Sequence, residues 1–173
     1  MLPQRKQRIE EMQARRWKDV VVVLENVDDP HNLGAILRSC DAVGVGEVHL
    51  VYSKGKAPRL RELKTNSAAS ATKWLTLKHW SSMNECLVEL RKRELKIVVT
   101  ALSVHGRAQW ECDFRVPCAI VVGNEHDGVS SELLEGADEI VTIPMRGMVQ
   151  SLNVSVATAV ILEEMLRQRL ISI

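Results

Sequence analysis

The chain has 173 residues, of which 46% are hydrophobic and 26% are charged, and its formal net charge is +1. This composition is close to the globular average and excludes a wholly disordered or fibrous chain, and the length predicts a single main domain with a core of its own. Because no apolar run approaches the roughly 20 residues of a membrane span and the N-terminus lacks the apolar core of a secretion signal, we expect a cytoplasmic protein with no membrane partner.

The chain begins with a predicted amphipathic helix from about Pro3 to Arg16. Ile9 and Met12 fall on one side of it, and charged residues occupy the rest. We interpret residues 1–18 as an N-terminal helical arm and residues 19–173 as the main domain.

A strand and a helix follow this arm. The β-branched run Val20–Leu24 is typical of a strand that is covered on both faces. Asp29 and Pro30 then form a good cap and first-turn pair for a helix from about His31 to Val43.

The rest of the chain continues the alternation of strands and helices. Further strands are predicted at Glu47–Tyr52, near Trp74–Leu77, and at Lys96–Leu102, Cys118–Val122 and Glu139–Ile143. Further helices are predicted from the capping box at Ser82 to about Glu94, near Ser131–Glu135, and at Val154–Leu166. The fold class is therefore α/β, with a mostly parallel sheet flanked by helices.

Three loops that leave strand ends carry unusual polar residues: Asp28–Asn32, Gly123–Gly128 and Met145–Asn153. Ligands of open α/β sheets bind at the carboxyl ends of strands. In the third loop, Ser151 and Asn153 stand where a helix needs its N-terminal donors satisfied, and such a helix start can also hold a ligand.

Several common sites are excluded. Gly44-Val45-Gly46 follows a helix and precedes a strand, the reverse of a dinucleotide-binding turn, and there is no phosphate-binding GxxxxGK[ST] loop. Ser151 lacks the GxSxG turn of a hydrolase nucleophile. His31 and His126 are interpreted as capping or surface residues rather than bases.

The four cysteines, Cys40, Cys86, Cys112 and Cys118, form no CxxC pair. We expect them to be small core residues, and we expect no metal site. The tryptophans Trp17, Trp74, Trp80 and Trp110 are interpreted as core or interface anchors.

Basic residues gather in two segments despite the near-neutral charge. The first holds Arg5, Lys6, Arg8, Arg15, Arg16 and Lys18, and the second holds Lys54, Lys56, Arg59, Arg61 and Lys64, just before the small-residue segment NSAASA. These segments are either solvated surface or the contact area of an anionic partner. Since aromatic residues are few, a folded RNA fits better than a single strand, and we expect no DNA partner.

Three long segments carry a family resemblance: NVDDPHNLGAILRSCDAVGV, IVVGNEHDGVS and IPMRGMVQSLNVSVATAVIL. They are similar, in this order, to the three motifs of the SpoU branch of the SPOUT methyltransferases. Together with the segment RKQRIEEMQARR, they most resemble the branch members that methylate a D-loop guanosine of tRNA.

The resemblance implies transfer of a methyl group from S-adenosylmethionine to a ribose 2′-hydroxyl of tRNA. It implies a catalytic set of Asn32, Arg38, Glu125, Ser151 and Asn153. It implies cofactor contacts, largely through backbone atoms, at Thr100, Leu102, Gly123, Ile143, Met148, Ser151 and Leu152.

The resemblance also implies a deep trefoil knot, in which the loop and helix of the third motif are threaded through an earlier loop. It implies a homodimer, whose interface would include the helix of the first motif and the face formed by Val154, Val156, Ala157, Val160 and Ile161. Relatives carry a further C-terminal helical extension, whereas this chain ends at Ile173. Two alternatives stay open: the same chemistry on rRNA or another tRNA position, and a non-catalytic RNA-binding module of the same fold.

Overall fold

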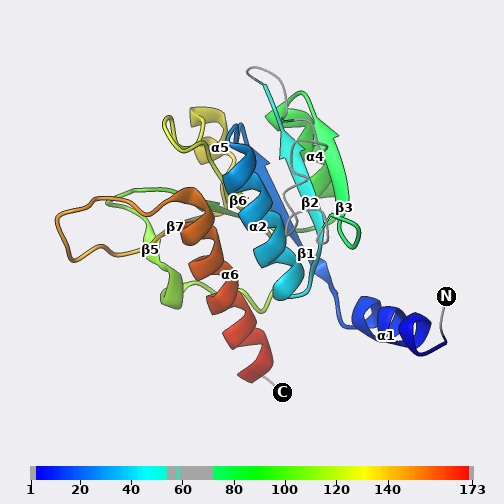
Figure 1. The fold of residues 1–173 in the computed structure, drawn as a ribbon. Helices are drawn as coiled ribbons and strands as arrows, with labels where there is room; N and C mark the ends of the chain where they lie inside the picture. Colours follow the sequence, from blue (N-terminus) through cyan, green and yellow to red (C-terminus); the bar gives the residue numbers. More distant parts are fainter. Residues whose placement is uncertain (1–2, 54–57, 59–71, 172–173) are drawn as a thin grey trace.

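The computed structural model describes residues 3–53, 58 and 72–171. Within these residues the chain forms a seven-stranded sheet in the order β3-β2-β1-β6-β4-β7-β5 (Figure 1), and every neighbouring pair of strands is parallel. The strands are β1 (Trp17–Glu25), β2 (Val45–Val51), β3 (Thr76–Trp80), β4 (Lys96–Thr100), β5 (Arg107–Ala108), β6 (Cys118–Val122) and β7 (Glu139–Thr142).

Helices alternate with these strands along the chain. They are α1 (Pro3–Ala14), α2 (Pro30–Ala42), α4 (Met83–Lys92), the 3-10 turn η1 (Gln109–Glu111), α5 (Ser131–Glu135) and α6 (Val154–Ile171). The predicted α/β class with a parallel sheet is confirmed. The second basic segment, Lys54 to Lys64, and the segment NSAASA lie outside the described residues, apart from Pro58.

The interior strand β1 is buried on both faces because its side chains alternate between two cores. Val20, Val22 and Leu24 pack in the core that includes α2 and α6. Val21 and Val23 pack on the opposite face, in the core that includes α4 and α5. The continuous β-branched run therefore reflects helices on both sides of the sheet, and Figure 1 shows α2 and α6 side by side on one of these sides.

Both predicted helix caps are present. The Asp29 carboxylate accepts a hydrogen bond from the His31 amide at 2.7 Å, and the Ser82 hydroxyl accepts one from the Glu85 amide at 3.4 Å. Gly44 ends α2 with a φ of +85°, a conformation that L side chains rarely adopt. Of the two glycines in Gly44-Val45-Gly46, Gly44 thus makes the turn from helix to strand, and Gly46 lies in β2.

The sheet differs from the prediction at both edges. At one edge, β3 spans Thr76–Trp80 rather than Trp74–Leu77, and at the other a further strand, β5, is present. β5 was not expected, because a two-residue strand is too short to show an alternating pattern. It pairs with β7 through Arg107 and Ala108 and forms the edge of the sheet. No helix in the described part of the chain is long and apolar enough to cross a membrane.

Candidate functional site

A cavity of about 640 Å³ opens at the carboxyl ends of β4, β6 and β7. Its wall comes from all three of the loops that follow these strands and from the first turn of α6. The lining residues include Thr100, Leu102, Gly123, Asn124, Glu125, Leu134, Ile143, Met145, Ser151, Leu152, Asn153 and Ala157. The cavity therefore mixes apolar side chains with a few polar groups, as small-molecule sites commonly do.

Beside this cavity, side chains from three distant segments form a chain of hydrogen bonds. The Asn32 amide nitrogen donates to Glu125 Oε1 at 2.8 Å. The Asn153 amide nitrogen donates to Asn32 Oδ1 at 3.0 Å. One residue from each of the three motif segments thus takes part in a single network.

The orientation of both amides follows from the carboxylate at the end of this network. Ionised Glu125 can only accept, so the Asn32 nitrogen must face it and the Asn32 oxygen must face Asn153. Asn32 is not the helix cap, because Asp29 fills that position. Its side chain is instead used to join the loops.

The loop that carries Glu125 is held by its neighbour Asn124, which the sequence did not single out. Asn124 Oδ1 accepts from the amides of His126 and Asp127, at 2.7 and 3.1 Å, and Asn124 Nδ2 donates to the Asn26 carbonyl at 2.6 Å. The two contacts with backbone amides form an Asx turn, in which an Asn side chain bonds to the backbone two residues further along. The last contact ties the end of β1 to the end of β6.

Tyr52 lies near the same carboxylates. Burial raises the pKa of Tyr52 well above its ordinary value, and the charges of Asp28 and Glu125 add to the effect. The phenol therefore stays protonated, and its hydroxyl donates to the Val27 carbonyl at 2.6 Å.

Arg38 lies apart from this network. It is six residues after Asn32 on α2, which places it about 120° around the helix and about 9 Å along it. Its side chain is exposed, does not line the cavity, and makes no hydrogen bond or ion pair within the described residues. Within the described residues of one chain, the Glu125 carboxylate bonds to Asn32 and makes no ion pair with Arg38, so a role for Glu125 in fixing the Arg38 guanidinium or in contacting the substrate stays a prediction.

Most of the residues predicted to contact a cofactor line the cavity: Thr100, Leu102, Gly123, Ile143, Ser151 and Leu152. Met148 does not line it, and its side chain is 99% exposed. The Thr100 hydroxyl is turned to the Val121 carbonyl, at 3.1 Å, so its side chain helps to hold β4 against β6.

At the start of α6, Asn153 is the residue that caps the helix. Its Oδ1 accepts from the Ser155 amide at 2.9 Å and from the Ser155 hydroxyl at 2.6 Å. Ser151 is exposed on the cavity wall and makes no hydrogen bond through its side chain within the described residues. The sequence suggested that both Ser151 and Asn153 satisfy donors at the start of this helix, but only Asn153 caps it.

Part of the α6 face predicted to form a dimer interface is buried in the core of the same chain. Val154 and Ile161 belong to the core that α6 shares with α2, so they cannot meet a second copy. Val156 is 48% exposed, and Ala157 and Val160 are half-buried.

The four cysteines are free and buried, as expected. Burial raises the pKa of the Cys40 and Cys86 thiols to about 12, which leaves them unreactive at neutral pH. His31 and His126 are exposed. No group of three or more His, Cys, Asp or Glu side chains in the described ranges could hold a metal ion.

Of the four tryptophans, Trp17 fits the role of an anchor, since its indole nitrogen donates to the Val43 carbonyl at 2.8 Å. Trp110 is 58% exposed, so it is not a core residue of this chain.

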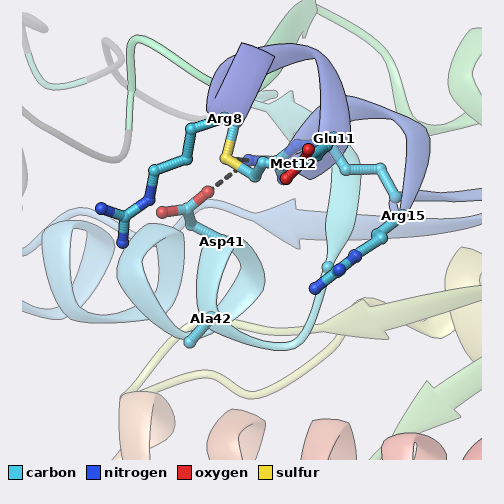
Figure 2. A pocket seen from close by; sticks show the side chains of 8 residues that line it. Arg8, Glu11, Met12, Arg15, Asp41 and Ala42 are labelled. Atoms are coloured by element: carbon cyan, nitrogen blue, oxygen red, sulfur yellow. Dashed lines mark hydrogen bonds and ion pairs between the residues drawn. The ribbon is translucent and has the colours of Figure 1, made fainter. Parts of the chain in front are cut away.

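A smaller pocket of about 320 Å³ lies between α1 and the C-terminal end of α2 (Figure 2). Arg16 is held inside the protein by Asp41 and by the Val45 carbonyl. Arg8 and Arg15 stay exposed beside it. The first basic segment therefore divides into one structural arginine and at least two that remain available to an anion.

Known proteins are similar to this chain in sequence and in fold. Residues 19–163 match the model of the SpoU rRNA Methylase family. The chain is 48% identical over 166 residues to a tRNA (guanosine(18)-2'-O)-methyltransferase of Thermus thermophilus, and the match covers 96% of this chain and 84% of that protein.

Two solved structures are also similar. A TrmH/SpoU tRNA modifying enzyme of Aquifex aeolicus superposes with a TM-score of 0.88 at 40% identity, covering 98% of this chain and 84% of that one. The methyltransferase AviRb of Streptomyces viridochromogenes, solved in complex with AdoMet, superposes with a TM-score of 0.77 at 29% identity, covering 87% of this chain and 57% of that one.

Proposed function

Because this chain belongs to the SpoU methylase family, we propose that it transfers a methyl group from S-adenosylmethionine to the 2′-hydroxyl of guanosine 18 in the D-loop of tRNA. The observation that carries this proposal is the network of Asn153, Asn32 and Glu125 beside the cavity. It joins all three segments whose sequences resemble the family motifs.

The cavity fits the cofactor in size and chemistry. Its volume, about 640 Å³, is within the usual range for a ligand of this size. Leu102, Leu134 and Ile143 offer apolar contacts for an adenine and the methionine chain. Backbone groups for polar contacts with the cofactor come from Thr100, Gly123 and Leu152. Because Gly123 has no side chain, its backbone can lie close to a bound cofactor. When bound, the cofactor supplies an electrophilic methyl group on a sulfonium.

The main task of the protein is then to position the ribose hydroxyl in line with that methyl group. Asn153 and Asn32 each keep one amide hydrogen that the network does not use, because each NH₂ group has two. Glu125 keeps Oε2 as an acceptor. These groups can bind the nucleotide and orient its 2′-hydroxyl at the cavity mouth.

Arg38 is proposed to act as a cation. A neutral arginine at pH 7 costs roughly 7–9 kcal/mol, so Arg38 is a poor proton acceptor. A charged guanidinium can instead hold an RNA phosphate or the developing alkoxide, while the proton leaves to phosphate or water.

We propose that two copies of the chain form the active enzyme. Arg38 is exposed and does not line the cavity of its own chain. A second copy packed on the outer surface of α2 and α6 would bring Arg38 of one copy toward the cavity of the other. Val156 and Val160 on α6 supply apolar surface for that contact.

The proposed RNA contact surface includes Arg8 and Arg15 beside α1. The family resemblance further supports a knot, in which residues 143–153 and α6 are threaded through an earlier loop. A tRNA substrate would place the activity in the cytoplasm.

The test is a methyl-transfer assay with labelled S-adenosylmethionine and tRNA. We expect label in the D-loop guanosine, and none when that nucleotide is 2′-deoxyguanosine, which keeps the base but lacks the acceptor. Label on rRNA or at another tRNA position would replace the substrate assignment. RNA binding without calorimetric binding of S-adenosylmethionine would instead indicate a non-catalytic module.

A further inference from the structure

The hydrogen-bond network does not end at Asn153. Asn153 Oδ1 accepts from both donors of Ser155, the backbone amide at 2.9 Å and the hydroxyl at 2.6 Å. Ser155 is half-buried in the first turn of α6 and does not line the cavity. It is therefore placed to act on the network without touching a bound ligand.

Every contact in this network donates in the same direction. Ser155 donates to Asn153, Asn153 donates to Asn32, and Asn32 donates to Glu125. Each amide offers nitrogen on one side and oxygen on the other, so reversing one member would place two acceptors together. The donors at one end and the acceptor at the other thus fix both amides between them.

We propose that Ser155 is a positioning residue for methyl transfer, whose hydroxyl and backbone amide together hold Asn153 Oδ1 and so keep the Ser155–Asn153–Asn32–Glu125 network in one donor direction. This inference rests on the proposed function for its kinetic consequence. The backbone amide of Ser155 can only donate, so it keeps Asn153 Oδ1 on its own side and the Asn153 amide nitrogen on the side of Asn32, and the hydroxyl adds a second donor that holds Oδ1 in place. The unused amide hydrogens of Asn153 and Asn32 are then presented to the nucleotide in one arrangement.

Three substitutions at this position separate the donor role from a merely structural one. Ser155→Thr keeps the hydroxyl, and we expect a kcat within about twofold of the unsubstituted chain. Ser155→Ala removes one hydrogen bond but leaves the backbone donor, so kcat should fall about five- to tenfold. Ser155→Asp places an acceptor against Asn153 Oδ1, which favours the reversed amide, and kcat should fall at least about another tenfold.

The aspartate variant is informative because it is expected to fold well. A negative charge in the first turn of a helix is favourable and opposes the loss of the Asn153 cap that follows when the amide is reversed, so the thermal midpoint should change little. Thr158→Val is the matched control. It removes a hydroxyl from the same helix, one that donates to the Val154 carbonyl at 2.7 Å rather than to the network. Its kcat should stay within about twofold.

A second readout does not depend on activity. In NMR spectra, the hydrogen-bonded side-chain amide protons of Asn32 and Asn153 should exchange with water more slowly than those of Asn84, whose side chain makes no hydrogen bond within the described residues, and this protection should be lost in Ser155→Asp. If protection changes as expected but no RNA is methylated, the proposed function is wrong and the network assignment stands. If Ser155→Asp keeps both the protection and the kcat, Ser155 does not set the direction.

Discussion

At the scale of single residues, Arg38 is a cation whose chemistry can be tested directly. If its role is electrostatic, lysine should replace it in part. We expect Arg38→Ala to lower kcat about 100- to 1,000-fold, the usual cost of losing one such donor, and Arg38→Lys to recover at least about tenfold of that loss. S-adenosylmethionine binding, measured by calorimetry, should be unchanged in both variants, because Arg38 does not line the cavity of its own chain and its proposed partner is the RNA phosphate or the developing alkoxide rather than the cofactor.

A matched control is Arg91→Ala, which removes an arginine from the opposite face of the sheet, where it pairs with Asp138 at 2.5 Å. Its kcat should not change. If Arg38→Lys transfers no more methyl than Arg38→Ala while both still bind RNA, cationic stabilisation by Arg38 is wrong.

His49 makes stability depend on pH. It is fully buried on β2, with Nε2 2.8 Å from Glu47 Oε1 and Nδ1 3.4 Å from Cys86 Sγ. Lys78 and Arg93 also bind Glu47, and with His49 they outweigh its burial and bring the pKa of Glu47 to about 2. Burial lowers the pKa of His49 below its usual 6.5, although Glu47 partly opposes this.

The sign of the effect follows from that lowered pKa. Above pH 6.5 both folded and unfolded chains carry neutral His49, and its contribution to stability is fully present. As the pH falls below 6.5 the unfolded chain binds a proton first, so the free energy of unfolding falls by up to about 1.4 kcal/mol per pH unit until the folded pKa is reached. Urea denaturation between pH 7.5 and 5 measures this loss. His49→Gln should reduce it, whereas His79→Gln, at an exposed site on neighbouring β3, should leave it unchanged.

At the scale of elements, the turn after β6 depends on the close approach of two glycines. A Cβ at Gly123 would overlap the carbonyl group of Gly128 and lie 2.7 Å from Val129 Cγ1. Because backbone cannot yield easily, Gly123→Ala should lower the free energy of unfolding by about 1–3 kcal/mol and weaken binding of S-adenosylmethionine. Denaturation and calorimetry measure the two effects.

Gly147→Ala is the comparison for this prediction. Nothing lies within 4 Å of a Cβ at Gly147, so unfolding should be unaffected. Equal stability of the two alanine variants would show that the turn can relax and that Gly123 is not required for close packing.

At the scale of the whole molecule, Arg169 joins the end of α6 to the start of the sheet. It is 8% exposed and donates to the carbonyls of Phe114 and Val116 and to the Asp19 carboxylate, at 2.7 to 3.1 Å. Its guanidinium also lies 5.1 Å from the Trp17 ring centre. Arg169→Ala would leave these acceptors without a donor and should cost about 2–4 kcal/mol of unfolding free energy.

Arg167→Ala provides the contrast on the same helix. Arg167 is exposed and pairs with Glu164, three residues earlier, so its loss should cost less than about 1 kcal/mol. Equal losses for both variants in urea denaturation would contradict a connecting role for Arg169.

The proposed dimer is also tested at this scale. Val156 on α6 and Val88 on α4 are 48% and 47% exposed and lie on helices that cover opposite faces of the sheet. Val156→Glu should shift the sedimentation mass toward a monomer and lower kcat, whereas Val88→Glu should change neither. A monomeric unsubstituted chain, or a dimer that withstands Val156→Glu, would refute this interface.

The sequence by itself determined the features that depend on neighbouring residues. The run Val20–Leu24 indicated a strand covered on both faces, because only a side-chain sequence apolar on both faces fits between two layers of helices. The caps at Asp29 and Ser82 were predictable because a cap bonds to an amide two or three residues away. The resemblance to a family named Asn32, Glu125 and Asn153 as site residues, but it did not say which of them touch.

The tertiary structure alone decided those contacts. Asn32 bonds to a residue 93 positions later and to another 121 positions later, and no local pattern encodes such a pairing. It also separated arginines that look alike in the sequence: Arg169 is buried among acceptors, whereas Arg38 is exposed. The spacing of Asn153 and Ser155 could be read in the sequence, but nothing local showed that the two side chains belong to one network. Only the folded structure shows that Ser155 and Asn153 begin a hydrogen-bond network that ends at Glu125. The donor direction of this network is set by groups that lie far apart in the sequence and meet only on folding.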